Sequence, residues 1–150
     1  LFTSVGLRRF TIPPWHMYLA SWLILASFSI LALQASFAKL AFFSGAMSAV
    51  TAALCVLQLV NPRETKSVQT IFGTCIVGCM MCGLAYDPSH AVPITSWFLP
   101  IASIPLSAIA YFLCKGKYKQ VLSLSITALI VSGAVVWAIL AVPKVDEMWP

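Results

Sequence analysis

Five apolar runs alternate with short polar segments along the chain, and each run is close to the length of one membrane crossing. A transmembrane helix needs about 20 apolar residues to cross a hydrocarbon core of about 30 Å. A proline follows the second, third and fifth runs, where it cannot continue a helical hydrogen-bond ladder. The pattern predicts an all-α, polytopic integral membrane protein, with residues 1–150 forming a single domain of about five transmembrane helices. The predicted helices are Met17–Gln34, Leu40–Val60, Val68–Tyr86, Pro93–Leu113 and Val121–Val142.

The third run is the shortest, because its fully apolar part begins only near Ile71. The basic residues favour it as a crossing. With five crossings, seven of the nine basic residues share a side with the N-terminus, whereas without the third run the split is five against four. Because Lys and Arg gather on the cytoplasmic side of a membrane protein, we expect the N-terminus on the positive side and the C-terminus opposite. The seven are Arg8, Arg9, Arg63, Lys66, Lys115, Lys117 and Lys119, against Lys39 and Lys144.

Composition agrees with a membrane location. Hydrophobic residues make up 61% of the chain and charged residues only 9%, against about 25% charged residues in a soluble domain. The net charge of +5 does not indicate nucleic acid as a partner, because the basic residues lie between apolar runs and set orientation. We expect the clusters at the N-terminus and before the fifth helix to contact anionic headgroups or acidic partners. Their residues are Arg8, Arg9, Lys115, Lys117 and Lys119.

The segment that precedes the first run is basic and rich in hydroxyls, and no acidic residue occurs before Glu64. This composition is typical of what remains of an organellar targeting peptide. We therefore expect an organellar inner membrane, the mitochondrial one first, with a bacterial inner membrane or another cellular membrane as the alternative.

No Asp, Glu, Lys, Arg or His lies in the middle of any run. Buried ionisable groups mark most proton and ion pathways in membranes, so a self-contained pump or ion-coupled carrier is not favoured. The two histidines, His16 and His90, are expected at opposite membrane faces, about 30 Å apart, and cannot share a haem or a metal within one chain. His16 is expected to be a polar residue at the interface. The sequence predicts no catalytic residue, no cofactor and no metal, with phospholipid as the expected bound molecule.

The third run carries a cysteine cluster, in which Cys75, Cys79 and Cys82 share one helical face. The Cys79-x-x-Cys82 spacing fits a thiol redox pair, but an apolar environment disfavours the thiolate that such chemistry needs. Small residues let membrane helices approach closely, so we interpret this face and a similar one in the second run as packing surfaces. The predicted packing residues are Gly45, Ala49, Ala53, Cys75, Gly78, Cys79, Cys82 and Gly83.

The fourth run contains Pro100 and Pro105 in its interior. Each removes a backbone donor and should bend the helix. Such a bend can open a pocket for a lipid, a quinone or another apolar molecule, with Trp97 beside it.

Three functions follow from these patterns. The first is a non-catalytic accessory or structural subunit of a larger membrane complex, such as a respiratory-chain or ATP synthase assembly, with other membrane subunits and lipids as partners. The alternative is a binding protein or carrier for an apolar ligand at Trp97, Pro100 and Pro105. The third is a thiol redox protein that uses Cys79 and Cys82.

Overall fold

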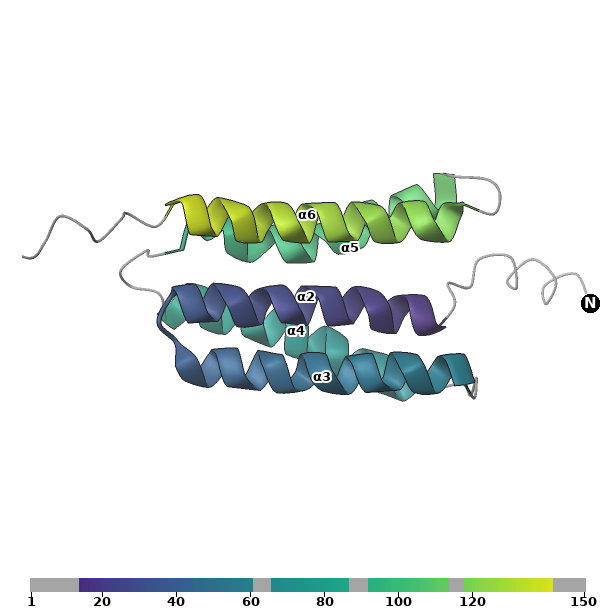
Figure 1. Cartoon of the computed structure of the whole chain (residues 1–150), viewed down its shortest axis with the longest axis horizontal. Helices are drawn as coiled ribbons and strands as arrows, with labels where there is room; N and C mark the ends of the chain where they lie inside the picture. The colour runs from purple at the N-terminus through teal and green to yellow at the C-terminus, as the bar shows by residue number, and fades with distance from the viewer. Residues whose placement is uncertain (1–13, 61–65, 87–91, 114–117, 142–150) are drawn as a thin grey trace, which may run out of the picture.

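The computed structural model describes residues 14–60, 66–86, 92–113 and 118–141, which form five α-helices and no strand (Figure 1). Each predicted helix is present, with bounds that differ from the prediction by three residues or fewer. The helices are α2 (Pro14–Gln34), α3 (Ala38–Val60), α4 (Lys66–Tyr86), α5 (Ile94–Leu113) and α6 (Lys119–Ala141).

Four of these helices, α2, α3, α5 and α6, are long and apolar enough to cross a membrane. In α4 the side chains are described over Ile71–Ala85, and this part of the helix is also apolar. The prediction of an all-α membrane protein is therefore confirmed.

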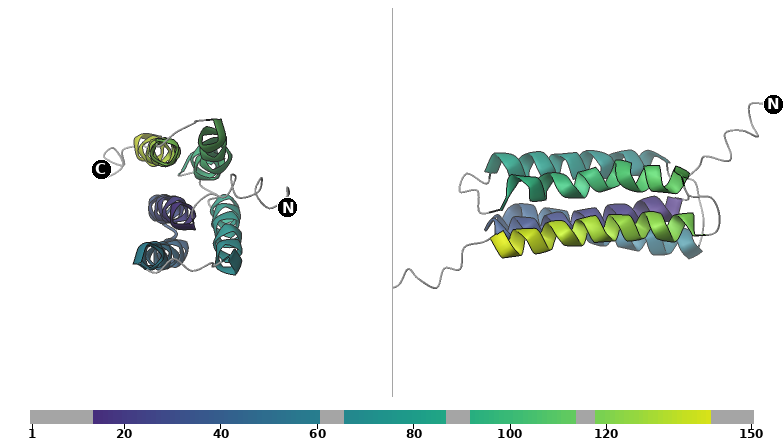
Figure 2. Two further views of the ribbon diagram at one scale, coloured as in Figure 1. Left: turned by 90° about the vertical axis from the view of Figure 1, so that its right-hand side faces the viewer. Right: turned by 90° about the horizontal axis from the view of Figure 1, so that it is seen from above.

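Helix α2 is the centre of the bundle. Viewed end-on, it lies in one row between α6 and α3, while α4 and α5 form a second row beside it (Figure 2). It packs against each of the other four helices. Several of its large side chains, among them Tyr18, Leu25 and Phe28, are fully buried, so α2 supplies much of the core.

A tight turn joins α2 to α3 and makes them antiparallel neighbours. The Phe37 N–H donates to the Ala32 carbonyl (2.8 Å) and the Ser36 N–H donates to the Leu33 carbonyl (3.0 Å). This is the Schellman pattern that ends many helices, and it needs a left-handed residue at Ser36, whose φ is 58°. The pattern allows α3 to return directly along α2.

The buried faces of α3, α5 and α6 carry many hydroxyl groups, whereas most of their large apolar side chains are exposed. In membranes, interhelical contacts favour small and hydroxylated residues, because lipid already accommodates the apolar ones. Some hydroxyls bond across helices: Ser29 donates to the Ala41 carbonyl at 2.9 Å and Ser123 to the Ser107 carbonyl at 2.8 Å. The buried hydroxyl residues of these three helices are Ser44, Ser48, Thr51, Ser96, Ser103, Ser107, Ser123 and Thr127.

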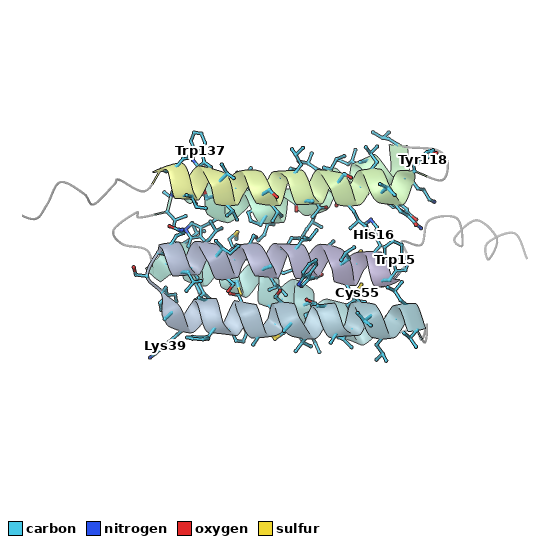
Figure 3. All side chains as sticks on the ribbon, in the orientation of Figure 1. Trp15, His16, Lys39, Cys55, Tyr118 and Trp137 are labelled. Atoms are coloured by element: carbon cyan, nitrogen blue, oxygen red, sulfur yellow. The ribbon has the colours of Figure 1, made fainter. Side chains whose placement is uncertain are left out.

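The two ends of the bundle differ. Trp15, His16 and Tyr118 lie at the end where α2 and α6 begin, and Lys39 and Trp137 lie at the other (Figure 3). We call the first the His16 end. Of the predicted headgroup contacts, Lys119 lies there, at the start of α6. Arg8, Arg9, Lys115 and Lys117 lie outside the described residues.

Candidate functional site

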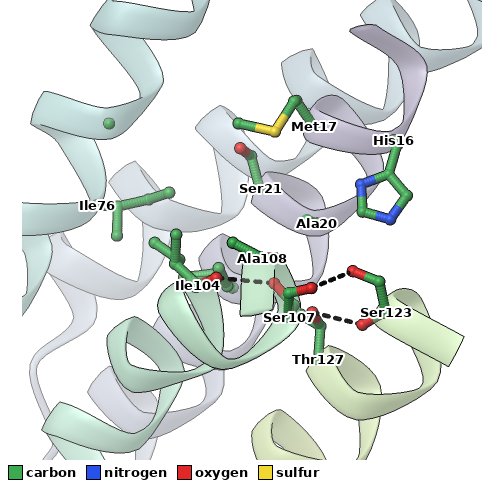
Figure 4. A pocket seen from close by; sticks show the side chains of 12 residues that line it. His16, Met17, Ala20, Ser21, Ile76, Ile104, Ser107, Ala108, Ser123 and Thr127 are labelled. Atoms are coloured by element: carbon green, nitrogen blue, oxygen red, sulfur yellow. Dashed lines mark hydrogen bonds between the residues drawn. The ribbon is translucent and has the colours of Figure 1, made fainter. Parts of the chain in front are cut away.

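A cavity of about 210 Å³ lies between α2, α4, α5 and α6, toward the His16 end (Figure 4). Most of its wall is apolar, and a few polar side chains come from α2, α5 and α6. We call it the four-helix cavity. Its lining residues are His16, Met17, Ala20, Ser21, Ile24, Gly73, Ile76, Ile104, Ser107, Ala108, Ser123 and Thr127.

His16 is the most distinctive of these residues. It lies in the first turn of α2, is only 3% exposed, and neither ring nitrogen has a hydrogen-bond partner in the described chain. The main chain of Gln120 is near the imidazole, but not at hydrogen-bond geometry. A buried polar group without a partner costs about 1–3 kcal/mol. His16 is therefore a group that a polar atom in the cavity would satisfy.

Aromatic rings hold His16 in place. The Tyr111 ring meets it edge-on with the centroids 5.7 Å apart, and the Trp15 ring does so at 5.9 Å. The ammonium group of Lys119 lies 4.6 Å from the centroid of the same Tyr111 ring, a cation–π distance. Tyr111 ends the buried face of α5 and Lys119 begins α6, so both helices close the bundle around the imidazole.

Three hydroxyl groups line the wall formed by α5 and α6. Ser107 donates to the Ile104 carbonyl (2.9 Å), Ser123 to the Ser107 carbonyl (2.8 Å) and Thr127 to the Ser123 carbonyl (3.2 Å) (Figure 4). Each hydroxyl proton is thus directed to the backbone. A hydroxyl oxygen has two lone pairs besides its proton, so these groups act as acceptors toward the cavity.

The predicted apolar site on α5 lies elsewhere. Trp97 and Pro100 are buried in the core and Pro105 is exposed, and none of them lines the four-helix cavity. Trp97 stacks on Phe28 with the ring centroids 6.1 Å apart. The α5 residues that line the cavity, Ile104, Ser107 and Ala108, lie beside Pro105 and one to two helical turns beyond Pro100 and Trp97.

The predicted packing residues differ in their surroundings. Those at helix contacts are Gly83, where a Cβ would collide with Trp97, Gly45, where a Cβ would lie 3.2 Å from Oγ of Ser29, and the buried Cys79. Cys75 is half-buried. The remaining residues lie on exposed faces of the described helices; they are Ala49, Ala53, Gly78 and Cys82.

Among the described residues, no group of three or more His, Cys, Asp or Glu is placed to hold a metal ion, and Cys55, Cys75, Cys79 and Cys82 are free thiols. His90 lies outside these residues. Comparisons of the chain with protein-family models, with curated proteins and with solved structures found no match.

Sequence reasoning did not identify the four-helix cavity. A signal was present: Ser123 and Thr127 are four residues apart and share one face of their helix. Nothing in the sequence, however, indicated that this face would meet His16 and Ser107.

Proposed function

We propose that this protein binds or carries, within the membrane, a small apolar molecule that has one polar end. The observation that supports the proposal is the four-helix cavity, whose largely apolar wall includes one buried imidazole with no hydrogen-bond partner among the described residues. Ligand sites are typically apolar pockets with a few convergent polar groups. This is the carrier function expected from the sequence, moved from Trp97, Pro100 and Pro105 to a different part of the bundle.

The volume limits the ligand. Sites for drug-sized molecules measure about 300–1,000 Å³, and an engineered apolar cavity of about 150 Å³ accepts benzene. A cavity of about 210 Å³ therefore fits one ring with a short chain, or an equivalent length of alkyl or isoprenoid chain.

Binding is a better interpretation of this site than hydrolysis. An activated serine needs an adjacent base that takes its proton. Here the protons of Ser107 and Ser123 are held by backbone carbonyls, and neither ring nitrogen of His16 makes a hydrogen bond.

A cavity-filling substitution tests the proposal. Ala108 and Ala110 are both half-buried on α5, but only Ala108 lines the cavity. Equilibrium dialysis of 4-propylphenol against phosphatidylcholine nanodiscs, with and without the full chain, should show saturable binding to the wild type and to Ala110→Phe. Ala108→Phe should lose it. Uptake that depends only on the amount of lipid, or is unchanged in Ala108→Phe, would overturn the proposal.

An accessory-subunit function is the second candidate, and a feature of α4 favours it. In the sequence, the continuously apolar part of α4 begins only at Ile71, after Lys66, Gln69 and Thr70, and at about 1.5 Å per residue it covers about 24 Å up to Tyr86, less than a hydrocarbon core of about 30 Å. A shallow hollow lined by Gly73, Thr74, Val77 and Gly78 runs along its exposed face. A transmembrane helix of a partner subunit would fill this hollow and relieve the mismatch with lipid.

Photocrosslinking in native membranes tests this candidate. Val77 on α4 and Val136 on α6 are matched, being 50% and 52% exposed. Benzoylphenylalanine at Val77 should link to one defined membrane protein, and at Val136 only to lipid. Lipid products at both positions would contradict the candidate. Its organellar setting, a respiratory-chain or ATP synthase assembly of the mitochondrial inner membrane, is proposed from the sequence alone.

A further inference from the structure

We infer that the ligand of the four-helix cavity is a hydroxyl-bearing apolar molecule, an alcohol, a phenol or a quinol, whose hydroxyl group bridges His16 and Ser107. This inference rests on the proposed function and specifies its ligand class.

The position of the hydroxyl group follows from the contacts of Tyr111. The His16 ring lies 5.7 Å from the Tyr111 ring, and Ser107 lies one helical turn before Tyr111 on the buried face of α5. Both His16 and Ser107 line the cavity. Ile24 and Ile76 line it farther from the His16 end, because α2 and α4 both begin at that end. The polar part of a ligand thus belongs near His16, and the apolar part between the isoleucines.

The hydrogen-bonding capacity of the wall selects the ligand class. Ser107 directs its proton to the Ile104 carbonyl and therefore offers a lone pair to the cavity. A neutral imidazole offers one N–H donor and one acceptor. A ligand hydroxyl matches this pair, because it can accept from His16 while donating to Ser107. A carbonyl or ether oxygen can only accept, so it leaves Ser107 without a donor, and a carboxylate would face that lone pair with negative charge.

A matched ligand pair tests the inference. 4-Propylphenol and its methyl ether, 4-propylanisole, share a ring and a chain, but only the phenol has a hydroxyl donor. In nanodiscs that contain the wild-type full chain, the phenol should bind about tenfold more tightly, the difference expected when one buried acceptor loses its donor.

A matched variant pair shows where the difference arises. Ser107 and Ser103 are both buried on α5, and each donates to the carbonyl three residues earlier, but only Ser107 lines the cavity. Ser107→Ala should lower the affinity for the phenol toward that for the ether and leave the affinity for the ether unchanged. Ser103→Ala should preserve the ratio of the two affinities. That ratio is also measured on the wild type alone, so the inference is tested even if Ser107→Ala does not fold.

NMR of the His16 imidazole shows where the ligand binds. The chain has two histidines, so the ring resonances of His16 are assigned with His90→Asn, and the phenol should shift them saturably. Equal affinities for phenol and ether, both saturable, would mean that the wall hydroxyls turn to donate; that result overturns this inference and leaves the proposed function standing. Absence of saturable binding by either probe would overturn both.

Discussion

The indole ring of Trp97 in α5 lies directly on the backbone of Gly83 in α4, where the Cβ of any larger residue would overlap it. The indole also stacks on Phe28 of α2, with the two ring planes 16° apart. One side chain thus joins α4, α5 and α2. The contact explains how α4, the least apolar of the predicted crossings, is held in the bundle.

Gly83→Ala should therefore destabilise the protein by about 1–3 kcal/mol, the usual cost of overpacking a close contact. Gly78→Ala is the control, since nothing lies within 4 Å of a Cβ at Gly78. It should be neutral or slightly stabilising, because alanine is the better helix former. Unfolding of both variants in mixed micelles, followed by circular dichroism, measures the difference. Equal stabilities would contradict the contact.

The hydrogen bond from Ser123 to the Ser107 carbonyl should stabilise the pairing of α5 with α6. We expect Ser123→Ala to cost about 0.5–1.5 kcal/mol in the same unfolding measurement. Ser125 lies on the exposed face of α6, so Ser125→Ala should change little. A Ser123→Ala protein as stable as Ser125→Ala would show that the bond contributes nothing.

The helices could be predicted from the sequence because the length of an apolar run is set by the membrane and not by neighbouring helices. The rotation of each helix about its own axis could not be predicted from the sequence. In α3 the sequence suggested a face through Gly45, Ala49 and Ala53, whereas the buried face passes through Ser44 and Thr51. Alanine can face lipid at little cost, while a hydroxyl favours a position where it can bond a neighbouring helix.

The cavity was unpredictable for a related reason. Pro100 and Pro105 identify α5 as an irregular helix, but a proline does not specify on which side space will open. His16 is the third residue of α2 and was expected at the interface. Its burial depends on the end of α5 and the start of α6, which meet over it only in three dimensions.

The orientation of the bundle makes a separate prediction. Lys39 is the second residue of α3 and Lys119 is the first of α6, at opposite ends of the bundle. In sealed vesicles of a cysteine-free variant, a membrane-impermeant maleimide should modify Lys39→Cys and Lys119→Cys from opposite sides, with Lys119→Cys on the positive, cytosol-like side. Labelling of both from one side would mean that α4 does not cross the membrane.

Two cysteines three residues apart on α4 should differ sharply in reactivity. Cys79 is 1% exposed and Cys82 lies on the exposed face. A lipid-soluble reagent such as N-ethylmaleimide should modify Cys82 and leave Cys79 free, as judged by peptide mass spectrometry. A Cys79–Cys82 disulfide in native membranes, or equal modification of the two, would favour the thiol redox hypothesis over packing.

The most direct measurement of ligand binding in the four-helix cavity is a methyl NMR titration. Ile76 and Ile104 line the cavity, while Ile139 is exposed on α6. With δ1-methyl-labelled isoleucine in nanodiscs, 4-propylphenol should shift Ile76 and Ile104 along a saturable curve, and Ile139 only in proportion to the phenol dissolved in lipid. If all three methyls shift in parallel without saturation, the cavity does not bind a ligand.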